Sequence, residues 1–231
     1  IRGLGGALPA DGLRLYLTDT LASPHTAPPL IAAVAPLARE QRRATAFKSN
    51  VPVLVCLGNP PYDREQHEVG HVGRRRGGWV RYGEEGQTEE DRPLLEDWIE
   101  PLTALGLGGH AKNAYNDYVY FWRWGVWKVF EKHPDEVAAR GGVLTYISAS
   151  SFLRGPAFAV MRQRLRELCD DIYVIDLGGE GRGTRRSENV FDIMTPVAIT
   201  ICVREPGTGP RAGRVHLRTG RTELGPRSWP A

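Results

Sequence analysis

The chain has 231 residues, of which 41% are hydrophobic and 25% are charged, and its formal net charge is +3. These values are typical of a globular protein with one sizeable α/β core, and the overall charge does not by itself indicate a nucleic-acid-binding protein. The sequence has no run of 18 apolar residues, no visible signal peptide and no CxxC pair among its three cysteines, so it favours a cytoplasmic protein without a membrane-spanning helix, a disulfide framework or a cysteine zinc site.

Strands and helices alternate in the first half of the chain. Residues 12–18 have the composition of a strand, and the alanine-rich residues 29–47 predict a helix. Residues 51–58 form a continuous apolar run closed by glycine and two prolines, which is typical of a central parallel strand buried on both faces. Residues 63–112 are rich in Gly, Arg and Glu and predict a long surface insertion, with a short helix near residues 93–104.

The alternation continues in the second half. The sequence predicts a helix over 113–132, a strand over 143–149, a helix over 156–169, and strands over 172–177 and 195–203. This order predicts a mostly parallel sheet covered on both faces. The last two strands are joined without a helix, so we expect them to form an antiparallel pair at one edge. From about residue 204 the chain becomes rich in Pro, Gly and Arg, and we expect it to leave the core.

Arginine greatly outnumbers lysine, and guanidinium groups bind phosphate through a bidentate fork. Two loops hold arginine clusters, one with Arg74, Arg75 and Arg76 and the other with Arg182, Arg185 and Arg186. The polar side of the helix over 156–169 is predicted to carry Arg162, Arg164 and Arg166. A GC-rich genome would produce the same excess, so phosphate binding and a solvated surface remain alternatives.

The tetrapeptide Asn59-Pro60-Pro61-Tyr62 (the NPPY turn) directly follows the predicted buried strand. Ligands of open α/β sheets bind at the carboxyl ends of strands. The Asn59 side-chain oxygen and the Pro60 carbonyl can accept hydrogen bonds from an aromatic amine, and the two prolines stiffen the turn. Such acceptors would draw the amine nitrogen toward tetrahedral geometry and stabilise its developing positive charge, while Tyr62 offers a flat face to a base. The alternative is a rigid turn without chemistry.

The NPPY turn resembles motif IV of the amino-methyltransferases, most closely that of the N6-adenine DNA methyltransferases of the gamma class. Four further segments resemble other motifs of that family in the same order: residues 18–21 (motif III), 112–118 (the start of the next helix), 142–152 (the next strand) and 189–203 (motif VIII). The insertion with Gly77–Arg81 and the loop over 178–189 resemble the methyltransferase region of single-chain type ISP restriction-modification enzymes.

The resemblance covers residues 12–205 and implies a Rossmann-like S-adenosylmethionine-dependent methyltransferase fold of the α/β class, incomplete at its N-terminal side. It implies transfer of a methyl group from S-adenosylmethionine to the N6 amino group of adenine, as part of a restriction-modification or phage-defence system. The partner that the resemblance implies is double-stranded DNA with a flipped adenine.

The resemblance also implies roles for individual residues. Phe191 would stack against the flipped adenine opposite Tyr62. Cofactor contacts are implied for Asp19, Thr20, Tyr115 and Asn116. DNA-phosphate contacts are implied for Arg182, Arg185 and Arg186. A solvated aspartate at 19 and core packing around Tyr115 and Asn116 are the alternatives, and no metal is implied.

The sequence departs from the family before Asp19, where neither a glycine-rich cofactor loop nor its partner acidic residue is found. The chain begins with isoleucine, close to a strand-like segment, which favours a piece of a longer protein. We expect residues 1–205 to be the catalytic half of a methyltransferase domain, with 63–112 as its insertion, and residues 206–231 to be a linker or the start of a following domain. Upstream nuclease, helicase and cofactor-loop regions and a downstream target-recognition domain are expected in that longer protein.

Other functions remain open at this point. Residues 67–71 match the HExxH string of zinc proteases, but the surrounding glycines disfavour the helix that this site needs, so we predict no metal site. The NPPY turn could serve a methyltransferase acting on another planar amide or amine, such as a protein glutamine or an RNA guanine. A non-catalytic remnant, folded but unable to hold the cofactor, is the third alternative.

Overall fold

The computed structural model describes residues 15–26, 35–62, 76–84, 92–178, 195–209 and 212–219. Its contacts divide the chain into two compact units, Ile1–Val51 and Pro52–Ala231. Among the described residues, no helix combines the length and the apolar character needed to cross a membrane.

The first unit contains helix α1 (Ala35–Asn50), which confirms most of the helix expected over 29–47. The strand expected over 12–18 is wrong in its described part, since residues 15–18 have no regular structure. The physical reason is that no described strand pairs with this segment, and Leu15 and Leu17 are 81% and 72% exposed. The segment is instead held to α1 by side chains, for example by the Tyr16 ring 5.9 Å from that of Phe47.

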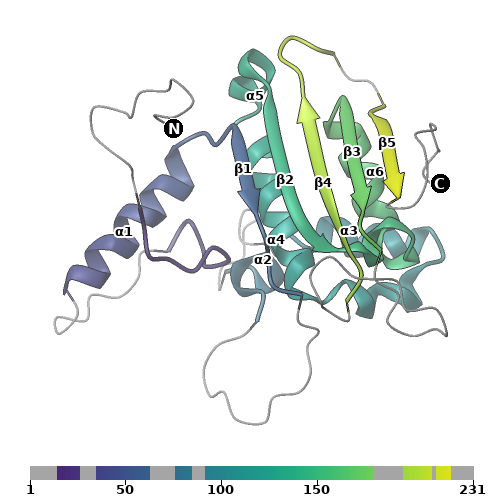
Figure 1. Ribbon diagram of the computed structural model, residues 1–231. Coiled ribbons are helices and arrows are strands. Elements are labelled where there is room, and N and C mark those ends of the chain that lie inside the picture. The colour runs from purple at the N-terminus through teal and green to yellow at the C-terminus, as the bar shows by residue number, and fades with distance from the viewer. Residues whose placement is uncertain are drawn as a thin grey trace. The chain divides into compact units, whose positions relative to one another are not determined.

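The second unit contains a five-stranded sheet in the order β1-β2-β4-β3-β5 (Figure 1). Its strands are β1 (Val55–Gly58), β2 (Gly142–Ala149), β3 (Asp171–Asp176), β4 (Val197–Arg204) and β5 (Arg214–Thr219). Strands β1 and β2 pair in parallel, as do β3 and β5, whereas β4 is antiparallel to both β2 and β3. The expected antiparallel pairing of the last two predicted strands, β3 and β4, is therefore confirmed. Its expected place at an edge is wrong, because β4 lies in the middle of the sheet.

Strand β1 is shorter and more exposed than the apolar run 51–58 predicts. Only Val55–Gly58 pair with β2, and β1 is an edge strand of the described sheet. Val55 and Leu57 are 59% and 73% exposed, so the prediction of a central strand buried on both faces is wrong for the described residues. An apolar run shows that a strand is suited to burial, but the position of the strand in the sheet decides how much of the strand is covered.

Strand β5 lies where the sequence indicated that the chain leaves the core. It pairs in parallel with β3, and its residues alternate between exposed and half-buried positions. Polar contacts hold it: the Arg214 guanidinium donates from Nε and Nη2 to the Asp171 carboxylate at 3.0 and 2.8 Å, and His216 Nε2 lies 2.7 Å from Asp171 Oδ1. An edge strand with this composition has no apolar run that would reveal it in the sequence.

Three helical segments of the second unit confirm the helices expected near 93–104, over 113–132 and over 156–169, and the described chain has further short helices. The helices of this unit are α2 (Gly78–Tyr82), α3 (Glu96–Ala104), the 3₁₀ helix η4 (Gly108–Ala114), α4 (Asp117–Val126), the π-helix η5 (Trp127–Glu131), α5 (Pro134–Arg140), the 3₁₀ helices η6 (Ser150–Leu153) and η7 (Pro156–Phe158), and α6 (Ala159–Leu168). Figure 1 shows α4 and α6 behind the sheet.

Within the described second unit, the helices cover one face of the sheet, not both as expected. The covered face is buried, as Leu144 and Ile172 illustrate, whereas Tyr173 and Ile175 on the opposite face are 42% and 38% exposed. The region 63–112 was expected to be a surface insertion, but its described parts enter the core. Trp79, Val80, Leu95, Trp98 and Leu102 are all 5% exposed or less.

Tyr146 of β2 joins the sheet to α4. Its ring packs edge-on against Trp122 at 5.0 Å, and its hydroxyl lies 3.6 Å from Cys56 Sγ on β1. A Cβ atom at Gly58 would lie 2.6 Å from the Tyr146 ring, and one at Gly125 would lie 2.6 Å from its hydroxyl. Glycine is therefore required at both positions for this close approach.

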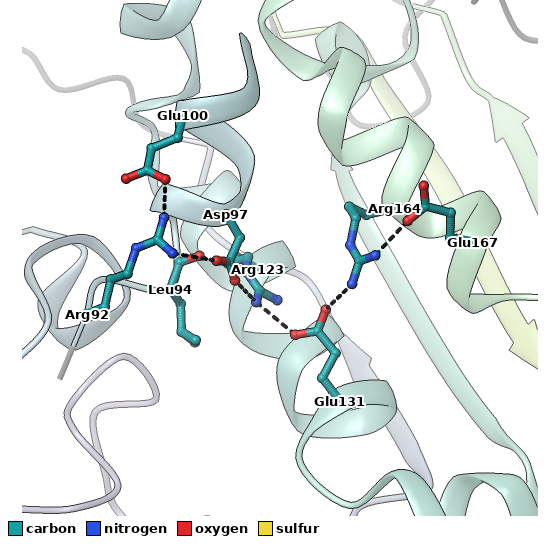
Figure 2. A network of polar contacts seen from close by, with 8 residues as sticks. All are labelled: Arg92, Leu94, Asp97, Glu100, Arg123, Glu131, Arg164 and Glu167. Atoms are coloured by element: carbon teal, nitrogen blue, oxygen red, sulfur yellow. Dashed lines mark hydrogen bonds and ion pairs between the residues drawn. The ribbon is translucent and has the colours of Figure 1, made fainter. Parts of the chain in front are cut away.

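Arg123 of α4 joins the surrounding helices through a buried polar network (Figure 2). Its side chain is 2% exposed, and its Nη2 lies 2.7 Å from Asp97 of α3 and 2.8 Å from Glu131 of η5. Its Nε donates to the Leu94 carbonyl at 2.9 Å, and Glu131 also lies 3.6 Å from Arg164 of α6. The guanidinium is the buried member of the network, whereas the Asp97 and Glu131 side chains are 45% and 20% exposed, so losing a carboxylate would leave a buried charge without that partner.

We predict that Gly58→Ala lowers the free energy of unfolding by about 1–3 kcal/mol, because its Cβ would overlap the Tyr146 ring. Urea unfolding measures the change. Gly109→Ala is the matched control, since no atom lies within 4 Å of its Cβ position, and it should unfold at the wild-type midpoint or above it. Equal stability of wild type and Gly58→Ala would contradict this packing.

We predict that the stability advantage of the wild type over Asp171→Asn depends on pH. Hydrogen bonds from Arg214 lower the pKa of Asp171, His216 lowers it further, and burial opposes them. A lowered pKa means that the carboxylate stabilises the fold fully above its unfolded value of about 3.9 and loses this effect as the pH falls through the folded value. The difference in urea midpoint between the wild type and Asp171→Asn should thus be constant from about pH 5 to about pH 7 and shrink toward about pH 3. A difference that stays constant down to the lowest pH would contradict the ion pair.

Candidate functional site

The NPPY turn lies at the carboxyl end of β1, where the sequence predicted it. Asn59 and Pro61 are exposed, Pro60 is buried and Tyr62 is half-buried. Parallel β2 ends beside it, since Gly58 is in register with Tyr146. The turn and the segment that follows β2 therefore share one edge of the sheet, which is where ligands bind in α/β proteins.

Within the turn, the Tyr62 hydroxyl donates a hydrogen bond to Asn59 Oδ1 and also lies 3.4 Å from the Ile147 carbonyl of β2. Burial raises the pKa of Tyr62, which keeps its hydroxyl protonated as a donor. A side-chain amide oxygen has two lone pairs, so Asn59 Oδ1 can accept this bond and one more. The contact orients the amide with its remaining acceptor capacity available to a ligand.

Hydroxyl groups and aromatic rings gather where β2 ends. Trp122 Nε1 donates to the buried Ser148 hydroxyl at 2.9 Å, and the hydroxyls of Tyr118 and Ser151 are 2.8 Å apart. The loop after β2 is fixed by Arg162, whose Nη1 donates to the Phe152 carbonyl at 3.0 Å and to the Gly155 carbonyl at 2.8 Å. The prediction that Arg162 lies on the polar side of its helix is wrong, because it is 6% exposed and binds these carbonyls.

A cavity of about 520 Å³ opens beside this loop and is called the Arg81 cavity here. It is lined by Arg81, Lys112, Asn113, Tyr115, Asn116, Tyr118, Ser151, Gly155, Pro156, Ala157 and Phe158. Its volume is in the range of small-molecule sites, about 300–1,000 Å³. Its described lining contains two cationic side chains and no carboxylate.

Arg81 is stacked among tyrosines at this cavity. Its guanidinium carbon lies 4.9 Å from the ring centroid of Tyr82, 4.8 Å from that of Tyr115 and 5.9 Å from that of Tyr120. Cation–π contacts of this kind attract the guanidinium to the faces of the rings and hold it in place. Burial raises the pKa of Tyr120, which therefore stays neutral beside the cation.

The structure brings two of the four predicted cofactor residues together. Tyr115 and Asn116 both line the Arg81 cavity, but Asn116 is 6% exposed and its side chain caps α4 by accepting from Tyr118 N at 3.3 Å. Asp19 and Thr20 lie in the first unit, where Asp19 Oδ1 accepts from Leu21 N at 3.1 Å. Asn116 therefore has the packing role that was the alternative to cofactor binding. The cofactor contacts of all four residues stay predictions.

Several predicted residues lie outside the described part of the chain and stay predictions. They are Phe191, Arg182, Arg185, Arg186, Arg74, Arg75 and the HExxH string at 67–71. Among the described residues, no group of three His, Cys, Asp or Glu side chains is placed to hold a metal ion.

The site includes residues to which the sequence analysis gave no role. Arg81, Lys112 and Phe158 come from three separate elements, and only the folded chain brings them to one cavity. One local feature could have pointed to Arg81: it follows two buried residues in a short helix and is flanked by Tyr82.

Comparison with solved structures gives matches over most of this chain. The ATP-dependent Type ISP restriction-modification enzyme LlaBIII, bound to DNA, matches with a TM-score of 0.64 and 28% sequence identity, over 93% of this chain and 13% of that one. This chain is similar to a segment of a type ISP restriction-modification enzyme. The similarity confirms the resemblance to type ISP restriction-modification enzymes. No protein-family model and no curated protein sequence matches.

Two further structures share the fold at lower identity. The DrdV–DNA complex matches with a TM-score of 0.54 and 20% identity, over 80% of this chain and 16% of that one. A nuclease-deletion mutant of the Type ISP enzyme LlaGI, in complex with a DNA substrate mimic, matches with a TM-score of 0.55 and 17% identity over the same shares. The chain thus spans about one-seventh of the length of the proteins that it matches.

Proposed function

We propose that this chain is part of a methyltransferase that transfers a methyl group from S-adenosylmethionine to the N6 amino group of adenine in DNA. The observation that carries the proposal is the NPPY turn at the carboxyl end of β1, with Asn59 exposed and its amide oxygen oriented by Tyr62. The likeness to LlaBIII, a restriction-modification enzyme bound to DNA, supports DNA as the substrate and restriction-modification as the setting.

The chemistry of the turn follows from the poor nucleophilicity of an aromatic amine. The lone pair of adenine N6 is delocalised into the ring, so the enzyme must localise it. Asn59 Oδ1 and the Pro60 carbonyl would accept the two amino hydrogens and stabilise the positive charge that develops on the nitrogen. Pro60 is buried and both prolines restrict the backbone, so these acceptors are held in place before the substrate binds.

Tyr62 has two functions in this proposal. Its hydroxyl orients Asn59, and its ring offers a stacking face to the flipped base, opposite Phe191. Stacking on an aromatic ring contributes roughly 1–3 kcal/mol per base, which offsets the few kcal/mol needed to extrude the base from the duplex.

S-adenosylmethionine would supply an electrophilic methyl group. Asp19 and Thr20 remain the proposed contacts to it, since a carboxylate suits a ligand with a cationic sulfonium and ribose hydroxyls. The surroundings of Tyr115 and Asn116 fit it poorly, because Arg81 and Lys112 line the same cavity and no described carboxylate does. The full-length enzyme is proposed to contain the upstream nuclease, helicase and cofactor-loop regions and a downstream target-recognition domain.

We predict that Asn59→Ala lowers the rate of adenine methylation by about 100- to 1,000-fold, because it removes an acceptor that acts on the transition state. The assay follows methyl transfer from labelled S-adenosylmethionine to duplex DNA by the full-length protein, with the methylated base identified by mass spectrometry. Gln163→Ala removes an exposed amide from α6 and should act at the wild-type rate. Methylation of a base other than adenine, or a fully active Asn59→Ala, would exclude the proposed function.

We predict that Tyr62→Phe lowers the same rate by roughly 2- to 10-fold, the value of one hydrogen bond, because it releases Asn59 while keeping the ring. Tyr62→Ala should lose more activity and also raise the KM for DNA, because it removes the stacking face as well. A Tyr62→Phe enzyme with the wild-type kcat would show that the hydroxyl does not position Asn59.

A further inference from the structure

The charge of the Arg81 cavity distinguishes between the two ligands that a DNA methyltransferase binds. Arg81 and Lys112 are its two charged lining residues in the described chain, and both are cationic. Asp117, the next residue after Asn116, is directed to Arg76, with an ion pair at 3.9 Å. S-adenosylmethionine carries a sulfonium, an ammonium and one carboxylate, so its net charge is positive. A DNA strand carries a negative phosphate at every nucleotide, which suits this lining.

The stacking of Arg81 is compatible with phosphate binding. The guanidinium lies over the Tyr82 and Tyr115 rings, and a guanidinium carries five N–H donors that phosphate oxygens can accept from. A guanidinium held in this way loses little further freedom when a phosphate binds to its edge. Lys112 is exposed and supplies a second cation from η4.

The rest of the lining suits a nucleoside. The Tyr118 and Phe158 rings are 2% and 4% exposed and pack 6.1 Å apart, so the half-buried Tyr115 ring is the more accessible aromatic group of the lining. The paired hydroxyls of Tyr118 and Ser151 add polar groups. The Gly155–Phe158 wall is rigid because Arg162 binds the Gly155 carbonyl, and a Cβ at Gly155 would lie 2.8 Å from the Phe158 ring. Aromatic faces beside cationic groups are the usual composition of single-strand nucleic-acid sites.

The cavity and the NPPY turn lie at the same edge of the sheet. Tyr62 of the turn contacts the Ile147 carbonyl of β2, and Ser151 of the cavity follows four residues later, after β2 has ended. A strand that presents one base to Asn59 therefore has its neighbouring nucleotides near this edge.

We infer that the Arg81 cavity binds the phosphate and nucleoside of a DNA nucleotide that adjoins the target base, and that it is not the cofactor pocket. The inference rests on the proposed function for the identity of the strand. It assigns Arg81 and Lys112 to the DNA phosphate and removes Tyr115 and Asn116 from the cofactor site.

The test compares two ligands on one set of variants of the full-length protein. Fluorescence anisotropy measures the affinity for a short labelled single-stranded oligodeoxynucleotide over a series of salt concentrations, and calorimetry measures the affinity for S-adenosylmethionine. Lys112→Glu should weaken oligonucleotide binding roughly tenfold and reduce the slope of log K against log salt by about one. Arg81→Lys should weaken it because the bidentate fork of the guanidinium is lost. Neither variant should change the affinity for S-adenosylmethionine.

Arg140→Ala is the matched control. This arginine is exposed on α5, just before β2 begins, and therefore at the opposite edge of the sheet. It should bind both ligands as the wild type does. Urea midpoints equal to that of the wild type establish that Lys112→Glu is folded.

Each remaining outcome decides against one statement. Unchanged oligonucleotide affinity in both cavity variants, or no oligonucleotide binding by the wild type, overturns the inference. Loss of S-adenosylmethionine affinity with DNA binding retained overturns it too and makes the cavity the cofactor pocket. Lys112-dependent oligonucleotide binding without adenine methylation leaves the inference standing and refutes the proposed function alone.

Discussion

The position of the Tyr146 ring is the constraint on which the rest of the site depends. This side chain fills the space that Gly58 and Gly125 leave open, packs against Trp122 and reaches Cys56 on the neighbouring strand. The NPPY turn begins one residue after Gly58, so the contact that brings β1 close to α4 also sets where the turn starts. A larger residue at position 58 would move the catalytic candidates as well as weaken the core.

The helices behind the sheet are tied together by charge rather than by apolar packing alone. Arg123 is buried between Asp97 and Glu131 and also binds a backbone carbonyl, so its donors reach α3, η5 and the segment before α3. Such a network contributes little net stability compared with apolar side chains, but removing one member leaves buried charge unpaired. Its effect is to fix the arrangement of the helices, and with it the loops that end at the functional edge of the sheet.

At that edge, the acceptors and the cations are separated. The turn after β1 offers oxygen atoms, from Asn59 and Pro60, which suit the hydrogens of an amine. The Arg81 cavity beside the loop after β2 offers Arg81 and Lys112, which suit phosphate. Under the proposed function, the target base of a DNA strand would bind at the turn and its backbone at the cavity, so the two would bind at different points of one edge.

The sequence by itself determined α1, α3, α4 and α6, strands β1 to β4, the antiparallel pairing of β3 with β4 and the place of Asn59-Pro60-Pro61-Tyr62 after a strand, because periodicity and turn residues are local properties. Only the tertiary structure decided that β4 lies between β2 and β3, that β1 is an exposed edge strand and that polar β5 joins the sheet. It also decided that Arg162 is buried against carbonyls and that Arg81, Lys112 and Phe158 meet at one cavity. These features depend on contacts between residues far apart in the chain, and neither local propensity nor hydrophobic pattern encodes which distant partner a residue meets.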